Sequence, residues 1–190
     1  MTHRAAADID LVARFVDGDV AAFDELMEAH EDRVFGICLR MLRDRDSALD
    51  AVQETFINVF RKADRYQAEA AFSTWLYRVA MNTCYDQLRK RKRKSAQPLP
   101  DSWDPADPRS GDEFAAAELR PQIEDALQAL SPEFRAAVVL VDLEGHALET
   151  VANMLAVPVG TVKSRVFRGR KLLAETLGNL RPGSEHQKDE

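Results

Sequence analysis

The chain has 190 residues, a formal net charge of −6, and 45% hydrophobic and 31% charged residues, which is typical of a soluble globular protein with one ordinary or two small domains. It contains no apolar run long enough to span a membrane, and its N-terminus lacks the charged and apolar regions of a secretory signal. We therefore expect no membrane insertion and a cytoplasmic location.

The first half of the chain is predicted to be helical. Apolar residues recur at helical spacing through most of residues 9–90, and residues 37–97 contain neither glycine nor proline. One amphipathic helix is predicted to bury an apolar stripe that consists of Leu49, Val52, Phe56, Val59, Phe60 and Ala63. The stripe loses its phase in residues 64–72, where we expect a break. A further helix follows, with Ser73 as its N-cap.

The middle of the chain changes composition sharply. Residues 97–113 contain four prolines, one glycine and five acidic residues, which predicts a flexible acidic linker over residues 96–114. The linker separates two predicted helical domains, residues 1–95 and 115–180, and residues 181–190 form a polar tail. The predicted fold class is therefore all-α, with two small domains.

Positive charge is concentrated in two blocks despite the acidic total. One block is RKRKRK at residues 89–94, and the other lies in residues 159–173, which contain five basic residues and no acidic one. Residues 95–131 hold eight acidic residues and two arginines. Because attraction to phosphate depends on local potential, the alternation favours nucleic-acid contacts at the basic blocks. For RKRKRK alone, a solvated helix end explains the charges equally well.

The second domain has the sequence signals of a helix-turn-helix. Ser131 and Pro132 are a typical N-cap and first helical residue, and the helix that they start ends at Gly145. A short helix, LETVANML, follows, and after the break at AVP a longer basic helix begins near Val159. Two helices joined by a tight turn, the second of them basic, are typical of DNA-binding proteins.

The last helix has an inner and an outer face. The inner face is predicted to contain Val162, Val166, Gly169 and Leu173. On the outer face, Phe167 could contact thymine methyls, Arg168 could form two hydrogen bonds with guanine, and Ser164 could bond several bases. The side chains that are expected to contact the phosphates of the DNA backbone are Thr161, Lys163, Arg165, Arg170 and Lys171. Alternatively, Phe167 packs on another helix of its own domain.

The quoted motifs resemble one protein family along nearly the whole chain. Residues 24–94, with DAVQETF and STWLYRVAMNTCYDQLR, resemble region 2 of an extracytoplasmic function (ECF) sigma factor, and LSPEFRAAVVLVDLEG with PVGTVKSRVFRGRKLL resembles its region 4. The end of the chain and RAAVVLVD are most similar to the actinobacterial SigM-like group. The resemblance implies a dissociable subunit of bacterial RNA polymerase that provides promoter recognition, helps open DNA and has no catalytic site of its own.

The resemblance also implies functional residues in region 2. In the family, the QE helix binds the clamp helices of the polymerase β′ subunit, which here implicates Asp50, Gln53, Glu54, Asn58 and Arg61. The loop before the TWL helix holds a flipped base of the single-stranded −10 element. The implied −10 contacts are Arg65, Tyr66, Gln67, Glu69, Arg78, Asn82, Arg89 and Arg91. This chain has YQAE where FRGD is frequent, which leaves the preferred base open. Phe72 and Trp75 are more typical of a core than of a melting wedge.

Region 4 of the family reads the −35 element. The residues implied for this contact are Thr161, Lys163, Ser164, Arg165, Phe167, Arg168 and Lys171. The chain departs from the family at Ala147, where Ser or Thr caps a helix, at Ala156, where Gly makes the turn, and at Gly169, where Ala is commoner. An alanine at positive φ would cost on the order of 1 kcal/mol, so either the turn differs or the domain tolerates the strain.

The resemblance implies three partners: core RNA polymerase, through the β′ clamp helices and the β flap; promoter DNA; and an anti-sigma factor, which could hold the protein at the membrane. No cofactor, metal or small-molecule substrate is expected, because the four histidines are scattered and lack metal-ligand spacing. Cys38 and Cys84 lie in apolar helical patterns and are interpreted as buried thiols in a reducing compartment. The alternative is a regulatory disulfide, which has no support because the sequence cannot place the two sulfurs together.

Two other functions compete with this interpretation. A stand-alone helix-turn-helix regulator with an N-terminal effector or dimerisation domain would bind duplex DNA without polymerase. A nucleic-acid enzyme is disfavoured, because the sequence shows no carboxylate cluster, phosphate-binding loop or paired nucleophile and base.

Overall fold

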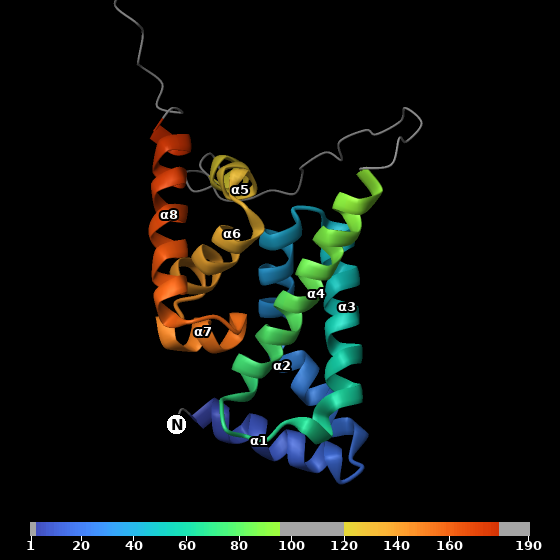
Figure 1. Cartoon of the computed structure of the whole chain (residues 1–190). Coiled ribbons are helices and arrows are strands. Elements are labelled where there is room, and N and C mark those ends of the chain that lie inside the picture. The colour runs from blue at the N-terminus through green and yellow to red at the C-terminus, as the bar shows by residue number, and fades with distance from the viewer. Residues whose placement is uncertain (1–2, 96–119, 179–190) are drawn as a thin grey trace, which may run out of the picture.

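The computed structural model describes residues 3–95 and 120–178, and within these ranges all regular secondary structure is helical (Figure 1). The all-α prediction is therefore confirmed for this part of the chain. None of the described helices combines the length and the apolar character needed to cross a membrane. The predicted acidic linker and polar tail lie outside the described residues.

The first unit is a bundle of four helices: α1 (His3–Val16), α2 (Val20–Leu42), α3 (Arg45–Lys62) and α4 (Phe72–Ser95), with a 3₁₀ turn, η1 (Ala63–Arg65), after α3. Two of these α-helices have an aspartate as N-cap. The Asp19 carboxylate accepts from the Ala21 amide at 3.1 Å at the start of α2, and that of Asp44 accepts from the Ser47 amide at 2.9 Å at the start of α3. Hydrogen bonds from Ser47 keep the pKa of Asp44 below its usual value. The predicted break at residues 64–72 is confirmed, but α4 begins at Phe72, so Ser73 lies inside its first turn.

Helix α3 buries a face rotated from the predicted stripe. The buried residues are Ala48, Ala51, Thr55, Phe56 and Val59, whereas Leu49 is 42% and Phe60 48% exposed. The prediction that these last two lie in the core is therefore wrong. The contact side of α3 begins with two alanines, and small residues let a helix approach its neighbours closely. Phe60 instead packs at the rim, with its ring centroid 4.9 Å from that of Phe15.

The two cysteines face each other across the core. Cys38 on α2 and Cys84 on α4 are both buried and unbridged. A hydrogen bond with Cys38, together with burial, raises the pKa of the Cys84 thiol. Thiolates are the reactive form of cysteine, so this pair has the character of unreactive core thiols. The prediction of two buried thiols is confirmed.

The second unit contains four α-helices and a π-helical turn: α5 (Arg120–Ala129), α6 (Pro132–Val138), the turn η2 (Val139–Leu143), α7 (Leu148–Leu155) and α8 (Val159–Gly178). The predicted N-cap at Ser131 is confirmed, because its hydroxyl accepts from the Phe134 amide at 3.4 Å. Helices α7 and α8 are the predicted helix-turn-helix pair. Ala147 precedes α7 without a side-chain cap.

The turn of the helix-turn-helix contains a strained alanine. Ala156 ends α7 in the left-handed region, with φ 52° and ψ 46°. The turn therefore has the left-handed residue that the resemblance implied, and the domain tolerates the strain. We expect Ala156→Gly to raise the free energy of unfolding by about 1 kcal/mol, because glycine has no Cβ to oppose this conformation. Chemical denaturation measures the change. The same substitution at Ala152, inside α7, should instead lower stability by about 1 kcal/mol, and equal effects at both positions would contradict the prediction.

Gly169 lets α8 approach α6 closely. A Cβ at this position would lie 2.6 Å from Val138 Cγ2, well inside normal contact. We expect Gly169→Ala to lower the free energy of unfolding by about 1–2 kcal/mol, because a buried β-branched side chain cannot move away freely. In a Val138→Ala background the same change should be neutral or stabilising, since alanine favours helix. A double-mutant cycle measured by denaturation tests this, and additive effects would contradict it.

The two units pack against each other, an arrangement that the sequence did not predict. Their buried residues join in one core cluster, which includes Val34, Tyr77 and Cys84 from the first unit and Leu140 and Val151 from the second. Figure 1 shows α7, at the foot of α8, beside α4. At this contact the rings of Tyr77 and His146 lie 5.5 Å apart. Burial, and after it the nearby Arg33 guanidinium, lower the pKa of His146.

Candidate DNA and polymerase interfaces

The outer face of α8 presents an aromatic side chain to solvent. Phe167 is 72% exposed, and Ser164, Arg168 and Lys171 are also exposed. On the inner face, Val162, Val166 and Gly169 are buried, whereas Leu173 is half-buried. The predicted faces are confirmed, and the alternative that Phe167 packs within its own domain is excluded. An exposed phenylalanine beside an arginine is chemically suited to apolar and hydrogen-bonding contacts with base edges.

The other polar residues of α8 differ in what surrounds them. Lys163 is exposed, whereas Thr161 and Arg165 are half-buried, and Arg165 lies near Tyr85 of α4. Burial raises the pKa of Tyr85 to about 12, against the opposing effect of Arg165. Arg170 donates from Nε to the Asp142 carboxylate at 3.1 Å. The basic residues of this helix are thus divided between open solvent and contacts within the protein.

The loop before α4 is held by an aromatic cluster. The Tyr66 hydroxyl donates to the Ala70 carbonyl at 2.7 Å, and its ring lies 5.6 Å from Phe72 and 5.7 Å from Trp75. Phe72 is fully buried and Trp75 half-buried, which confirms their interpretation as core residues. Arg65, Gln67 and Glu69 are exposed. The contacts of Tyr66 therefore hold the loop in place, and the polar side chains of the loop extend from it into solvent.

All four predicted DNA contacts on helix α4 are exposed, but one of them is also bonded within the protein. Arg78, Asn82 and Arg89 are exposed, and Arg89 pairs with Asp86 at 3.2 Å. Arg91 differs, because its guanidinium donates to the Leu42 carbonyl at 3.0 Å and to the Asp44 carboxylate at 3.2 Å. It bridges α4 to the corner between α2 and α3, which the sequence could not show because these partners are more than forty positions away.

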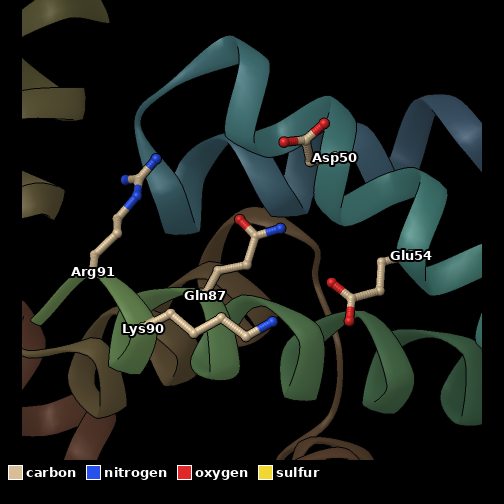
Figure 2. A pocket seen from close by; sticks show the side chains of 5 residues that line it. All are labelled: Asp50, Glu54, Gln87, Lys90 and Arg91. Atoms are coloured by element: carbon tan, nitrogen blue, oxygen red, sulfur yellow. The ribbon is translucent and has the colours of Figure 1, made fainter. Parts of the chain in front are cut away.

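The polar side of α3 adjoins this basic end of α4. Figure 2 shows an open groove with Asp50 and Glu54 on its α3 side and Gln87, Lys90 and Arg91 on its α4 side. The four predicted polymerase contacts Asp50, Gln53, Glu54 and Arg61 are exposed, and the fifth, Asn58, is half-buried. In the described ranges, no group of three or more His, Cys, Asp or Glu side chains is arranged to hold a metal ion.

Comparisons with known proteins place the chain in one family. The family model for Sigma-70 region 2 matches residues 26–94, and the model for Sigma-70 region 4 matches residues 120–173. The chain is 38% identical over 177 residues to the ECF RNA polymerase sigma factor SigM of Mycobacterium tuberculosis, across 93% of this chain and 88% of that protein. The chain belongs to the ECF family of RNA polymerase sigma factors. It is also 42% identical to SigE of Mycolicibacterium smegmatis over 166 residues, which cover 84% of this sigma factor and 64% of that relative.

Solved structures of sigma factors share this fold. The sigma factor RpoE of Bartonella quintana, in complex with the anti-sigma factor NepR, is 26% identical with a TM-score of 0.66, covering 82% of this chain and 96% of that one. CnrH in complex with the cytosolic domain of CnrY has a TM-score of 0.70 at 23% identity, which extends the likeness of the fold to a second solved structure. The first unit of this sigma factor is thus region 2, and the second is region 4.

The structure adds apolar residues that sequence reasoning missed on the region 2 surface. Leu49, Ile57 and Phe60 are 42%, 50% and 48% exposed on α3, the helix that carries Gln53 and Glu54. Exposed large apolar side chains in a row are typical of protein-binding surfaces. One signal was present in the sequence: Ile57 lies outside the apolar stripe, four positions after Gln53.

Proposed function

We propose that this sigma factor binds core RNA polymerase, directs it to promoters by recognising −10 and −35 elements, and helps open the DNA. The observation that carries the proposal is Phe167, which is 72% exposed on α8 while the opposite side of the helix is packed in the core. An aromatic side chain held in water is costly unless a ligand covers it, and base edges in the major groove offer such a surface.

At the −35 element, Ser164, Phe167 and Arg168 read base edges, and the neighbouring side chains of α8 position the duplex through its phosphates. At the −10 element, Gln67 and Glu69 offer hydrogen-bonding groups to an unpaired base, and Tyr66 shapes the loop from beneath. Arg78, Asn82 and Arg89 follow the backbone upstream of that base. Arg91 is assigned to holding α4 in place, because its guanidinium is already bonded within the protein.

Core polymerase is proposed to bind the exposed side of α3. Gln53 and Glu54 supply hydrogen bonds to the β′ clamp helices, and Ile57 beside them supplies apolar contact. Interfaces of this kind combine a few apolar anchors with a polar rim. The β flap is the proposed partner of region 4. The sigma factor acts as a specificity subunit without a catalytic site of its own, in the cytoplasm with the polymerase.

Control by an anti-sigma factor is proposed because the similar RpoE is a sigma factor solved in complex with one. An anti-sigma factor anchored in the membrane would hold this sigma factor at the membrane surface.

In vitro transcription with purified core polymerase on a promoter library tests the proposal. We expect initiation only when the sigma factor is added, from promoters that share −10 and −35 sequences. If no initiation is redirected and no complex with core forms, the proposal fails. Tight sequence-specific duplex binding by the protein alone would instead support a stand-alone regulator.

A further inference from the structure

A buried carboxylate of region 4 holds two arginines of region 2. The side chain of Glu144 is only 7% exposed, and its two oxygens accept from Arg33 Nε at 3.1 Å and from Arg40 Nη1 at 2.9 Å. Both arginines lie on α2, and Gly36 between them leaves the space that the Arg40 guanidinium occupies, because a Cβ there would lie 3.2 Å from Arg40 Nη1. A carboxylate buried this deeply is stable only when it is paired, so Glu144 depends on region 2.

Region 4 also caps the C-terminal end of α2. The last carbonyls of a helix have no partner within it. Here the Arg40 carbonyl accepts from Gln128 Nε2 at 2.9 Å, and the Met41 carbonyl accepts from Arg135 Nη1 at 2.5 Å. Arg135 is itself 5% exposed and is oriented by three carbonyls of its own unit, those of Leu127, Gln128 and Leu130. At the edge of this contact, Arg43 pairs with Asp125.

The contact between the two regions also includes Arg165, a residue of the proposed −35 surface. Tyr85 of α4 is largely buried, and both Arg165 and Glu133 of region 4 act on it electrostatically. Arg165, a proposed phosphate contact, is half-buried in this arrangement, while Phe167 and Arg168 stay exposed. With the two regions packed together, the proposed base-reading side chains therefore stay exposed, whereas Arg165, a proposed phosphate contact, lies near Tyr85 of region 2.

We propose that Glu144 is a latch that holds region 4 closed on region 2 in the free sigma factor, and that binding of promoter duplex competes with this closed state. The second half of the proposal rests on the proposed function, since it takes α8 as the −35 reader. The first half concerns only the arrangement of the two regions. The latch is electrostatic and specific, because the Glu144 carboxylate pairs with both Arg33 and Arg40 across the interface between the regions.

Single-molecule energy transfer on the free full-length chain tests the latch. Dyes are attached at Asp46→Cys on α3 and Ala174→Cys on α8, which are exposed positions, whereas the native cysteines are buried. We expect one closed population in the parent and a rise of about 100-fold in the open-to-closed ratio for Glu144→Arg, because breaking a buried pair leaves like charges together. An unchanged ratio overturns the latch.

The triple variant Arg33→Glu, Arg40→Glu, Glu144→Arg restores opposite charges and should return the closed population, which a folding defect would not allow. Asp142→Asn is the matched control, because Asp142 lies two positions before Glu144 but pairs with Arg170 of its own unit, and it should leave the ratio unchanged. Opening by the control, or no rescue by the triple variant, overturns the assignment to Glu144.

Binding of a −35 duplex without polymerase, measured by fluorescence anisotropy, tests the competition. Glu144→Arg should bind about 10-fold more tightly than the parent, and equal affinities overturn this half of the proposal. If Glu144→Arg opens the protein but no variant supports transcription with core, the latch stands and the proposed function fails. If transcription works but the population does not respond to Glu144→Arg, only the latch fails.

Discussion

Ile57→Arg is expected to lower the affinity of the sigma factor for core RNA polymerase by about 30-fold. Central apolar anchors of protein interfaces contribute roughly 2 kcal/mol each, and an arginine here would place an unpaired charge against an apolar surface. The substitution should leave folding intact, because Ile57 is half exposed and arginine is a good helix former. Competition with a labelled parent sigma factor for core polymerase measures the change.

Val20→Arg is the matched control. Val20 is the first residue of α2 and is 58% exposed, close to the 50% of Ile57, and it lies outside both α3 and region 4, the parts proposed to bind core polymerase. It should compete for core like the parent. The double substitution Gln53→Ala, Glu54→Ala should weaken binding in the same direction as Ile57→Arg. Parent-like affinity in both α3 variants would remove this helix from the polymerase interface.

Arg168→Ala is expected to relax recognition at one position of the −35 element. An arginine that forms two hydrogen bonds with a guanine contributes roughly 1–3 kcal/mol of discrimination against other bases. Transcription from promoters with the preferred base should fall about 10- to 100-fold, while promoters that already carry another base there should change little. Transcription of a library randomised across the upstream element, read by sequencing, gives the position.

Lys171→Ala provides the comparison for a phosphate contact on the same face of α8. It should weaken transcription evenly across upstream sequences and reduce the salt dependence of DNA binding. If Arg168→Ala gives the same even loss, then Arg168 contacts only phosphate, and base reading on this helix falls to Ser164 and Phe167.

The arrangement of charges is compatible with DNA binding by an acidic protein at the proposed surfaces. The basic residues of α8 that remain in solvent, such as Lys163 and Arg168, lie on the exposed face around Phe167. Other basic residues pair with carboxylates of the protein at its surface, as Arg170 of α8 does with Asp142 and Arg91 of α4 does with Asp44. Net charge therefore understates the positive potential at the proposed reading face.

The sequence by itself determined the features of this protein that depend on near neighbours along the chain. Helical periodicity predicted the all-α fold and the outward position of Phe167, and capping chemistry placed the start of α6 at Ser131. The resemblance placed Ala156 at the turn but left open whether the turn differs or the strain is tolerated, and the structure decides this with its left-handed conformation.

Only the tertiary structure decided the features that depend on distant partners. The rotation of α3 was set by how closely its alanines let α2 and α4 approach, which exposed Leu49 and Phe60. Arg91, which is exposed, is bonded to carbonyl and carboxylate groups at the corner between α2 and α3. The Arg40–Glu144 pair joins residues 104 positions apart, and no local pattern can show which buried carboxylate meets which arginine, because that choice is made by the packing of the two regions.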